Sequence, residues 1–213
     1  TFVNSVQSKG FANPNITWYT SQTYNAGVDV AAWKGLLSAS FDVFKRDRSG
    51  LLATQILSLP SVVGATLPQE NLNSDRTQGF DLELNHKNHI GDFNYYLKST
   101  FSYTRTQNMK VVRASDGNSQ INWRDNPNNR NNNISWGFGS AGQYQSYNDI
   151  LNSPTFVDRN AVVGDYAYED WNGDGQINDQ DIHPIAFSGE PLITYGLTIG
   201  SSYKGFDLSM LLQ

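Results

Sequence analysis

The sequence predicts an all-β protein made of antiparallel up-and-down strands from a transmembrane β-barrel, with long extracellular loops. Apolar and polar residues alternate along six segments, which is the pattern of strands with one apolar face. The turns between paired segments are short, whereas two connections are very long. Short turns at one edge of the sheet and long loops at the other are typical of outer-membrane barrels.

The composition agrees with a β-protein that carries long polar loops. Charged residues make up 16% of the 213 residues, against roughly 25% in an average soluble chain. The net charge of −5 argues against nucleic acid as a partner. The absence of cysteine excludes disulfides, zinc–thiolate sites and Fe–S sites. No run of 18 or more apolar residues occurs, so we expect no transmembrane helix.

The alternating segments form three predicted hairpins. The first joins strands near 23–32 and 35–46 through Trp33-Lys34-Gly35, the second joins 79–88 and 92–106, and the third joins 191–203 and 205–213. Both ends of the chain fall inside patterned segments, so we expect a fragment of a longer protein. The predicted apolar face is lined by the following residues: Leu37, Ala39, Phe41, Val43, Phe80, Leu82, Leu84, Phe93, Tyr95, Leu97, Phe101, Tyr103, Ile193, Tyr195, Leu197, Ile199, Phe206, Leu208, Met210 and Leu212.

Two stretches interrupt the alternation. Residues 47–72 contain Pro60, Gly64 and Pro68 and predict a long connection, and the charge run at 45–48 predicts a solvated strand end. Residues 107–190 predict one long, irregular extracellular loop that is rich in asparagine.

Alternation alone fits two architectures, a barrel in lipid and a soluble β-sandwich whose apolar faces pack together. The asymmetry of the connections favours the barrel. Aromatic residues near both strand ends fit interfacial girdles in a lipid bilayer. Charged residues on the other face fit a wide, wet lumen: Asp29, Asp42, Asp81, Glu83, Lys98 and Asp207.

Residues 170–181 have the spacing of a calcium loop of the EF-hand kind. Asp170, Asn172 and Asp174 supply side-chain oxygens at loop positions 1, 3 and 5, and Gly175 permits the turn. Prolines follow this loop, so it is not part of a helix–loop–helix hand.

The remaining ligands complete the predicted Ca²⁺ site. Gln176 offers its main-chain carbonyl, Asn178 a direct or water-bridged contact, and Asp181 the closing carboxylate, while Ile177 points away and anchors the loop. Because position 12 is Asp rather than Glu, we expect a structural ion. The alternative is a turn held by its own Asx hydrogen bonds.

Several segments together resemble the SusC/RagA-type TonB-dependent transporters of Bacteroidota outer membranes. Gly164-Asp165 and the run from Tyr168 to Gly175 look like that family's G-D-x-x-Y-x-D-x-N-G-D-G segment. Further pieces continue the similarity: Pro184-Ile185, Ser188-Gly189, Pro191, Ile193-Thr194-Tyr195-Gly196, Lys204-Gly205-Phe206-Asp207-Leu208, Asn15-Ile16-Thr17-Trp18, Asn25-Ala26-Gly27-Val28-Asp29, Phe44-Lys45-Arg46-Asp47, Gly50-Leu51-Leu52, Asn73, Gly79, Phe80, Glu83, Gly137-Phe138 and Tyr144-Gln145-Ser146.

The resemblance implies a nutrient importer of the bacterial outer membrane. It implies a large barrel with an N-terminal plug, a segment that contacts the TonB complex, and a SusD-like surface lipoprotein that caps the pore. The plug and the TonB-contacting segment are expected outside these 213 residues. The implied cargo is an oligosaccharide or a peptide.

Four aromatic residues of the long loop are candidates for contact with cargo or with the lipoprotein, namely Trp123, Trp136, Tyr144 and Tyr147. For each of them, packing within the loop itself is the alternative. A second function is a soluble calcium-stabilised β module for binding or adhesion. Catalysis is not expected, because the three histidines form neither an H-E-x-x-H nor a G-x-S-x-G motif.

Overall fold

A computed structural model describes residues 12–54, 67–115, 117–156, 160–187, 189 and 191–213. The chain divides into two compact units. Unit 1 contains residues 1–112, 128–131 and 190–213, and unit 2 contains residues 113–127 and 132–189. No helix in the described ranges is both long and apolar enough to cross a membrane.

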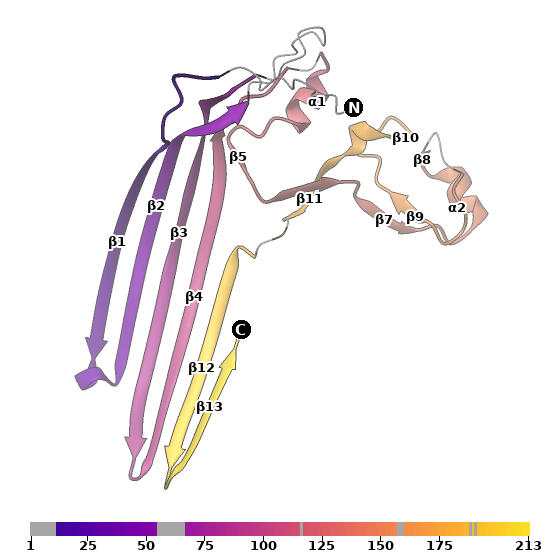
Figure 1. Ribbon diagram of the computed structural model, residues 1–213. Helices are drawn as coiled ribbons and strands as arrows, with labels where there is room; N and C mark the ends of the chain where they lie inside the picture. The colour runs from indigo at the N-terminus through magenta and orange to yellow at the C-terminus, as the bar shows by residue number, and fades with distance from the viewer. Residues whose placement is uncertain (1–11, 55–66, 116, 157–159, 188, 190) are drawn as a thin grey trace, which may run out of the picture. The chain divides into compact units, whose positions relative to one another are not determined.

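Unit 1 is an antiparallel sheet whose strands follow the order β1-β2-β3-β4-β12-β13 (Figure 1). A two-residue strand, β5, pairs with β4 beside this path. A 3₁₀ turn (η1, Trp33–Gly35) joins the first two strands. The strands are β1 (Thr20–Ala32), β2 (Leu37–Thr54), β3 (Gln69–Ile90), β4 (Phe93–Lys110), β5 (Arg130–Asn131), β12 (Ile193–Tyr203) and β13 (Phe206–Leu212).

The register brings the predicted apolar residues onto one face. Val28, Phe41, Leu82 and Phe101 are successive cross-strand partners, and Tyr195 continues their row on β12. Phe80 lies among Phe41, Phe101 and Tyr103 with ring centroids 5.8–5.9 Å apart. The all-antiparallel prediction is therefore confirmed, and this surface is called the apolar face.

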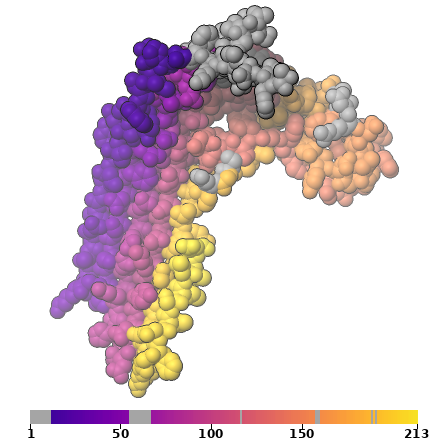
Figure 2. Space-filling model, in the orientation of Figure 1, coloured from indigo at the N-terminus to yellow at the C-terminus, as the bar shows by residue number. Residues whose placement is uncertain are grey.

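The apolar face of unit 1 is exposed. The side chains of Val28, Tyr195 and Phe206 are 56%, 66% and 81% exposed, and in the described residues only Tyr144 and Ile177, both in unit 2, are buried apolar side chains. Figure 2 shows the indigo, magenta and yellow segments of unit 1 side by side. The described residues thus supply no second sheet of the kind that a β-sandwich requires.

Two strands are much longer than expected. β2 continues to Thr54 instead of ending near 46, and β3 begins at Gln69 instead of near 79. Of the predicted connection at 47–72, residues 47–54 and 69–72 are strand, and Pro60 and Gly64 lie outside the described residues. The charge run at 45–48 lies inside β2 and is not a strand end. Alternation failed here because residues 45–49 are polar on both faces and the register then shifts on both sides of Leu51, which breaks the period. The other strand ends differ from the predictions by a few residues, since β1 begins at Thr20 and β4 ends at Lys110.

Unit 2 replaces the irregular loop expected at 107–190 with a small folded body. Three two-stranded sheets, β6–β11, β7–β9 and β8–β10, form it together with two helices of six residues each. Phe138, Phe156 and Tyr168 pack edge to face around its centre, with ring centroids 5.2–5.6 Å apart. The elements are α1 (Ser119–Arg124), β6 (Ile134–Gly137), β7 (Ser140–Gln143), α2 (Tyr147–Asn152), β8 (Thr155–Phe156), β9 (Tyr166–Tyr168), β10 (Gln176–Ile177), η3 (Asp179–Asp181) and β11 (His183–Phe187).

Candidate functional site

The second face of the sheet in unit 1, called the polar face, is the first candidate site. Because successive strand residues point to opposite faces, the register places Gly27, Asp42, Asp81, Ser102 and Thr194 in one row across five strands. The next row toward the short turns contains Asp29, Ser40, Glu83, Thr100 and Gly196.

Charged side chains on the polar face are connected into networks. Lys98 Nζ lies 2.9 Å from Glu83 Oε2, and Asn85 donates a hydrogen bond of 2.8 Å to Glu83 Oε1. Ser102 donates to Asp81 at 2.5 Å. A hollow of about 660 Å³ is lined by Asp29, Asp42, Asp81 and Glu83 among others. This surface suits contact with water and polar solutes.

Ion pairs on both faces hold the extension of β2 and β3. The guanidinium of Arg48 makes a bidentate ion pair with the carboxylate of Asp75. Asp75 is only 8% exposed. On the opposite face Arg76 donates to Asp47 at 2.6 Å, and Lys45 lies 3.3 Å from the same carboxylate. Paired charges therefore stabilise a ladder that has no apolar face.

The calcium-type loop of unit 2 is the second candidate site. Asp170 accepts three main-chain hydrogen bonds of 2.7–3.1 Å, from Gly173, Asp174 and Gly175. Asn172 Oδ1 accepts from Asp174 N at 2.9 Å, and Asp174 Oδ1 accepts from Gln176 N at 2.9 Å. These bonds turn the first three predicted ligands toward one another.

The closing residue of the loop is fully buried. Asp181 is 0% exposed and accepts main-chain hydrogen bonds from Asn172 at 3.3 Å and Asn178 at 2.8 Å. Asn178 caps η3 and donates to Asp174 Oδ2 at 3.4 Å. Ile177 is 2% exposed, so its predicted role as the anchor of the loop is confirmed.

The donor set of this loop has the chemistry that Ca²⁺ prefers, since all its candidate ligands are oxygens. Asp174 Oδ2 contacts only the side-chain amides of Asn172 and Asn178, at 3.1 and 3.4 Å. Hydrogen bonds, first from Gln176 N–H and then from the Asn172 amide, lower the pKa of Asp174, which keeps it ionised. In the described residues no three His, Cys, Asp or Glu side chains gather as a metal site. A cation here therefore depends on amide and main-chain oxygens as well, and the Asx hydrogen bonds by themselves also account for the turn.

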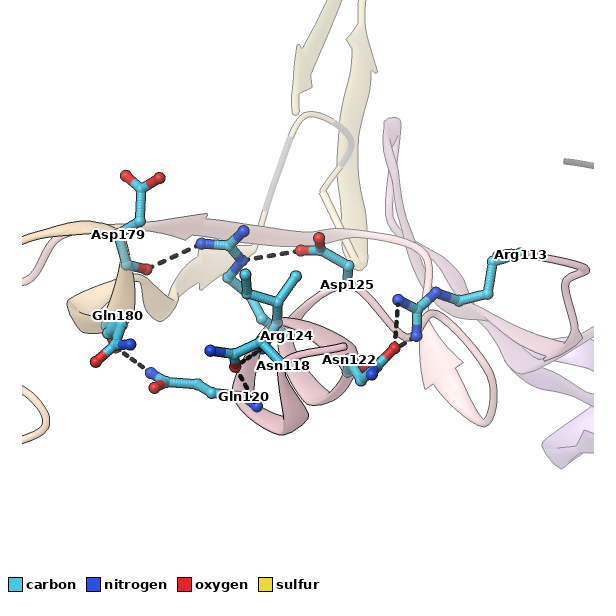
Figure 3. A network of polar contacts seen from close by, with 9 residues as sticks. Arg113, Asn118, Gln120, Asn122, Arg124, Asp125, Asp179 and Gln180 are labelled. Carbon is cyan, nitrogen blue, oxygen red and sulfur yellow. Dashed lines mark hydrogen bonds and ion pairs between the residues drawn. The ribbon is translucent and has the colours of Figure 1, made fainter. Parts of the chain in front are cut away.

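Helix α1 is tied to the far end of the same loop (Figure 3). Arg124 Nη1 donates to the carbonyl of Asp179 at 2.9 Å, and the Gln120 side chain donates to the carbonyl of Gln180. Arg124 Nε also pairs with Asp125 at 2.9 Å, which lowers the pKa of that carboxyl group. Two side chains of α1 thus hold the η3 turn that carries Asp181.

The four predicted contact aromatics have different environments. Tyr147 begins α2 and is 72% exposed, and Trp123 is 48% exposed with its ring 5.4 Å from that of half-buried Trp136. Tyr144 is only 4% exposed, and its hydroxyl donates to Pro154 O at 3.0 Å. Burial, followed by the charge of Asp165, raises the pKa of this hydroxyl. Tyr144 therefore packs the interior of unit 2 and does not offer its ring to a ligand.

His183 lies beside the loop but was not among the site residues predicted from the sequence. His183 is 5% exposed, its Nδ1 lies 2.8 Å from Asp181 O, and its ring stacks on Trp171 with centroids 3.9 Å apart. Its position two residues after the last predicted ligand was the available signal.

Comparisons with known proteins identify the family. The family model described as "TonB dependent receptor-like, beta-barrel" matches residues 2–184. The chain belongs to this family. TonB-dependent receptor P3 of Formosa agariphila is 26% identical over 99% of this chain and 22% of its own length. The TonB-dependent receptor SusC of Bacteroides thetaiotaomicron is 25% identical over the whole chain and 21% of its own length.

Solved structures support the same fold. A RagAB peptide importer in a "closed-closed" state gives a TM-score of 0.65 at 21% identity, covering 92% of this chain and 21% of that one. Its "open-open" state gives 0.63 at 22% identity, covering 94% and 21%. The chain thus spans about a fifth of the length of its relatives. As part of an outer-membrane β-barrel, its apolar face meets lipid and its polar face meets the lumen.

Proposed function

We propose that this chain forms part of the wall and outer loops of a TonB-dependent importer that takes up oligosaccharides or peptides. The two-faced sheet carries the proposal, because an exposed apolar face opposite a charged face fits a wall between lipid and a wet pore. Similarity to SusC and to a peptide importer favours this cargo class. Contact with the TonB complex is assigned to parts of the protein outside this chain. The soluble β module finds no support in a sheet whose apolar face is left exposed by the residues that the structure describes.

Import is tested in the source bacterium with the complete gene. Deletion of the gene should abolish uptake of at least one of two defined mixtures, one of peptides and one of oligosaccharides. Reintroducing the complete gene should restore that uptake. Loss of TonB should have the same effect as the deletion. Unchanged uptake of both mixtures in the deletion strain would contradict the proposal.

We infer further that unit 2 contacts a SusD-like lipoprotein that caps the pore. Tyr147 and Trp123 offer exposed aromatic surface of the kind that often anchors protein interfaces. Replacing both with alanine should lower the amount of lipoprotein that copurifies with the full-length barrel. Tyr195→Ala, on the apolar face, serves as the control and should leave copurification unchanged. Equal retention by all three proteins would argue against this contact.

We propose Ca²⁺ as the ion of loop 170–181, with Asp170, Asn172, Asp174, Gln176, Asn178 and Asp181 as its ligands. The ion would brace the loop and leave cargo recognition to other residues. Trp171 lies within the loop, so it can sensitise the luminescence of Tb³⁺, a luminescent stand-in for Ca²⁺. Full-length protein should show terbium emission that calcium displaces.

A pair of variants sharpens this test. Asp170→Asn together with Asp174→Asn should abolish the emission, whereas Asp125→Asn, at the residue that follows α1, should preserve it. Absence of emission in the unaltered protein, with no calorimetric heat at millimolar calcium, would leave the Asx-turn explanation in place.

A further inference from the structure

Arg46 differs from two other cations of the polar face, Arg48 and Lys98, in its partners. Arg48 is bound at two atoms by Asp75, and Lys98 is paired with Glu83. Arg46 instead belongs to a cross-strand row whose other members are threonines, namely Thr23, Thr77 and Thr106. Within the described ranges no carboxylate forms an ion pair with it.

The hydrogen-bonding capacity of Arg46 is largely unused. Its one contact runs from Nη2 to Thr77 Oγ1 and is 3.4 Å long, at the limit of a hydrogen bond. Thr77 Oγ1 is itself engaged with Thr106 Oγ1 at 3.0 Å. The Nε atom is buried and has no partner among the described residues. A guanidinium carries five N–H donors in a planar fork, so this side chain lacks a strong acceptor.

The adjoining row on the same face adds an aromatic surface. Phe44 is two residues before Arg46, so the two side chains share the polar face. The Phe44 ring reaches over Gly79, because a Cβ built on that glycine would lie 2.8 Å from Phe44 Cζ. A planar aromatic surface therefore lies beside an unneutralised guanidinium, with the hydroxyls of the Thr23, Thr77 and Thr106 row around it.

We propose that Arg46 recognises a carboxylate on the imported molecule. This inference rests on the proposed import function, which makes the polar face a surface that cargo meets. A carboxylate matches the fork of a guanidinium at two points, which a neutral hydroxyl cannot do. The group belongs either to an acidic peptide or to a uronic acid unit of an oligosaccharide, and both share this chemistry.

The test uses the full-length transporter in its own host and two matched pairs of cargo. One pair consists of peptides that differ only by Asp or Asn, and the other of oligogalacturonides and galacto-oligosaccharides of equal length. Each pair is supplied as an equimolar mixture. Uptake is followed by mass spectrometry of the cargo that remains in the medium. The unaltered protein should remove the acidic member of at least one pair faster, and that pair identifies the source of the carboxylate.

The acidic preference is the ratio of the uptake rates of the acidic and the neutral member of a pair. Arg46→Gln should reduce this ratio by roughly tenfold, as expected for loss of a charge-assisted hydrogen bond, while uptake of the neutral member continues. Arg46→Lys should retain part of the preference. Lys87→Gln removes the same charge from the same face near the short turns and should leave the preference unchanged.

Two results with Arg46→Gln would overturn the proposal. Equal preference in Arg46→Gln and the unaltered protein would show that cargo does not use this residue, and import itself would stand. An unchanged preference together with reduced thermal stability of Arg46→Gln would instead show that Arg46 forms a structural ion pair with a carboxylate elsewhere in the complete protein. If the unaltered protein takes up no member of either pair, this inference fails, whereas the import proposal is decided separately by the deletion strain.

Discussion

At the scale of single residues, some positions on the polar face of the sheet have room only for glycine, because atoms of the neighbouring strands lie close to them. Gly79 leaves room for the Phe44 ring and for the main chain of β4, and Gly200 leaves room for the Tyr96 ring in the same way. An aromatic ring laid over a glycine on the next strand covers its exposed main chain and fixes the register. These pairs place flat aromatic surfaces in an otherwise polar wall.

Gly79→Ala should destabilise the barrel more than Gly27→Ala. A Cβ on Gly79 would lie 2.1 Å from the main-chain oxygen of Tyr103, which the sheet holds in place, whereas a Cβ on Gly27 would meet Asp42 Oδ1 at 2.1 Å. The Asp42 side chain can rotate away, but the main chain of β4 cannot. We expect a loss of about 1–3 kcal/mol for Gly79→Ala and less for the control. The measurement is the temperature at which the folded barrel loses its compact gel mobility; equal shifts would refute the packing explanation.

Arg124→Met should loosen the end of the calcium-type loop. The substitution removes the hydrogen bond to the Asp179 carbonyl and the ion pair with Asp125. Loss of a hydrogen bond from a charged group predicts amide exchange at 179–181 that is roughly tenfold faster. Arg113→Met is the matched control, because Arg113 bonds only to Asn122 among the contacts shown in Figure 3. Hydrogen-exchange mass spectrometry checks this, and identical rates in the two variants would count against α1 as a support.

At the scale of elements, β2 and β3 continue well past the part that has an apolar face. β3 has 22 residues, which at a rise of about 3.3 Å per residue corresponds to roughly 70 Å. A strand tilted across a bilayer needs only about 9–11 residues. The remainder of the hairpin therefore lies outside the hydrocarbon, where cross-strand ion pairs replace lipid contact.

Asp75→Ala should weaken this extension more than Asp47→Ala. Asp75 is the more buried partner, with 11% of its side chain exposed against 32% for Asp47. We expect a loss of about 2 kcal/mol for Asp75→Ala, between the values for exposed and buried pairs, and about 1 kcal/mol or less for Asp47→Ala. Amide exchange over residues 47–54 and 69–78 reports the difference. The same exchange rate in both variants would show that burial does not rank these pairs.

The sequence allowed prediction of those strands in which apolar and polar residues alternate. One apolar face was readable over residues 37–43, 80–84, 93–103 and 193–212, because every second residue of each strand lies on it. The extension from Asp47 to Thr54 was not readable, because its first three residues are polar on both faces and the register then shifts around Leu51. The strands of unit 2 have only two to five residues, which is too short for alternation to appear. The bond from Arg124 to Asp179 joins residues 55 positions apart and has no local signature, whereas the Asx pattern of the loop itself does.

At the scale of the whole molecule, the chain combines a sheet that meets lipid with a separately folded unit. Strands β4 and β12 precede and follow unit 2 in the sequence, yet they are direct hydrogen-bonded neighbours, with Tyr103 opposite Ile193. Unit 2 is therefore an insertion into a hairpin whose two strands hold each other. We therefore expect the sheet to fold with little dependence on the residues of unit 2.

Replacing residues 132–189 of unit 2 with a short Gly/Ser linker, which keeps β5 in place, should separate assembly from import. Because β4 and β12 remain paired, the full-length protein should still reach the outer membrane as a heat-modifiable barrel in near-normal amount. Uptake and lipoprotein retention should fall to the level of the deletion strain. Proteolytic loss of the shortened barrel would instead show that unit 2 is needed for assembly.

An insertion held between two paired strands also affects how such a protein changes over generations. Recombination within the gene can exchange this cassette for another and leave the lipid-facing wall intact. On the outer side of the barrel, where we propose that this cassette lies, bacteriophages and antibodies would meet it first, and selection by them would act on the cassette before it acts on the barrel. A population can therefore vary its antigenic surface while it keeps one inherited pore.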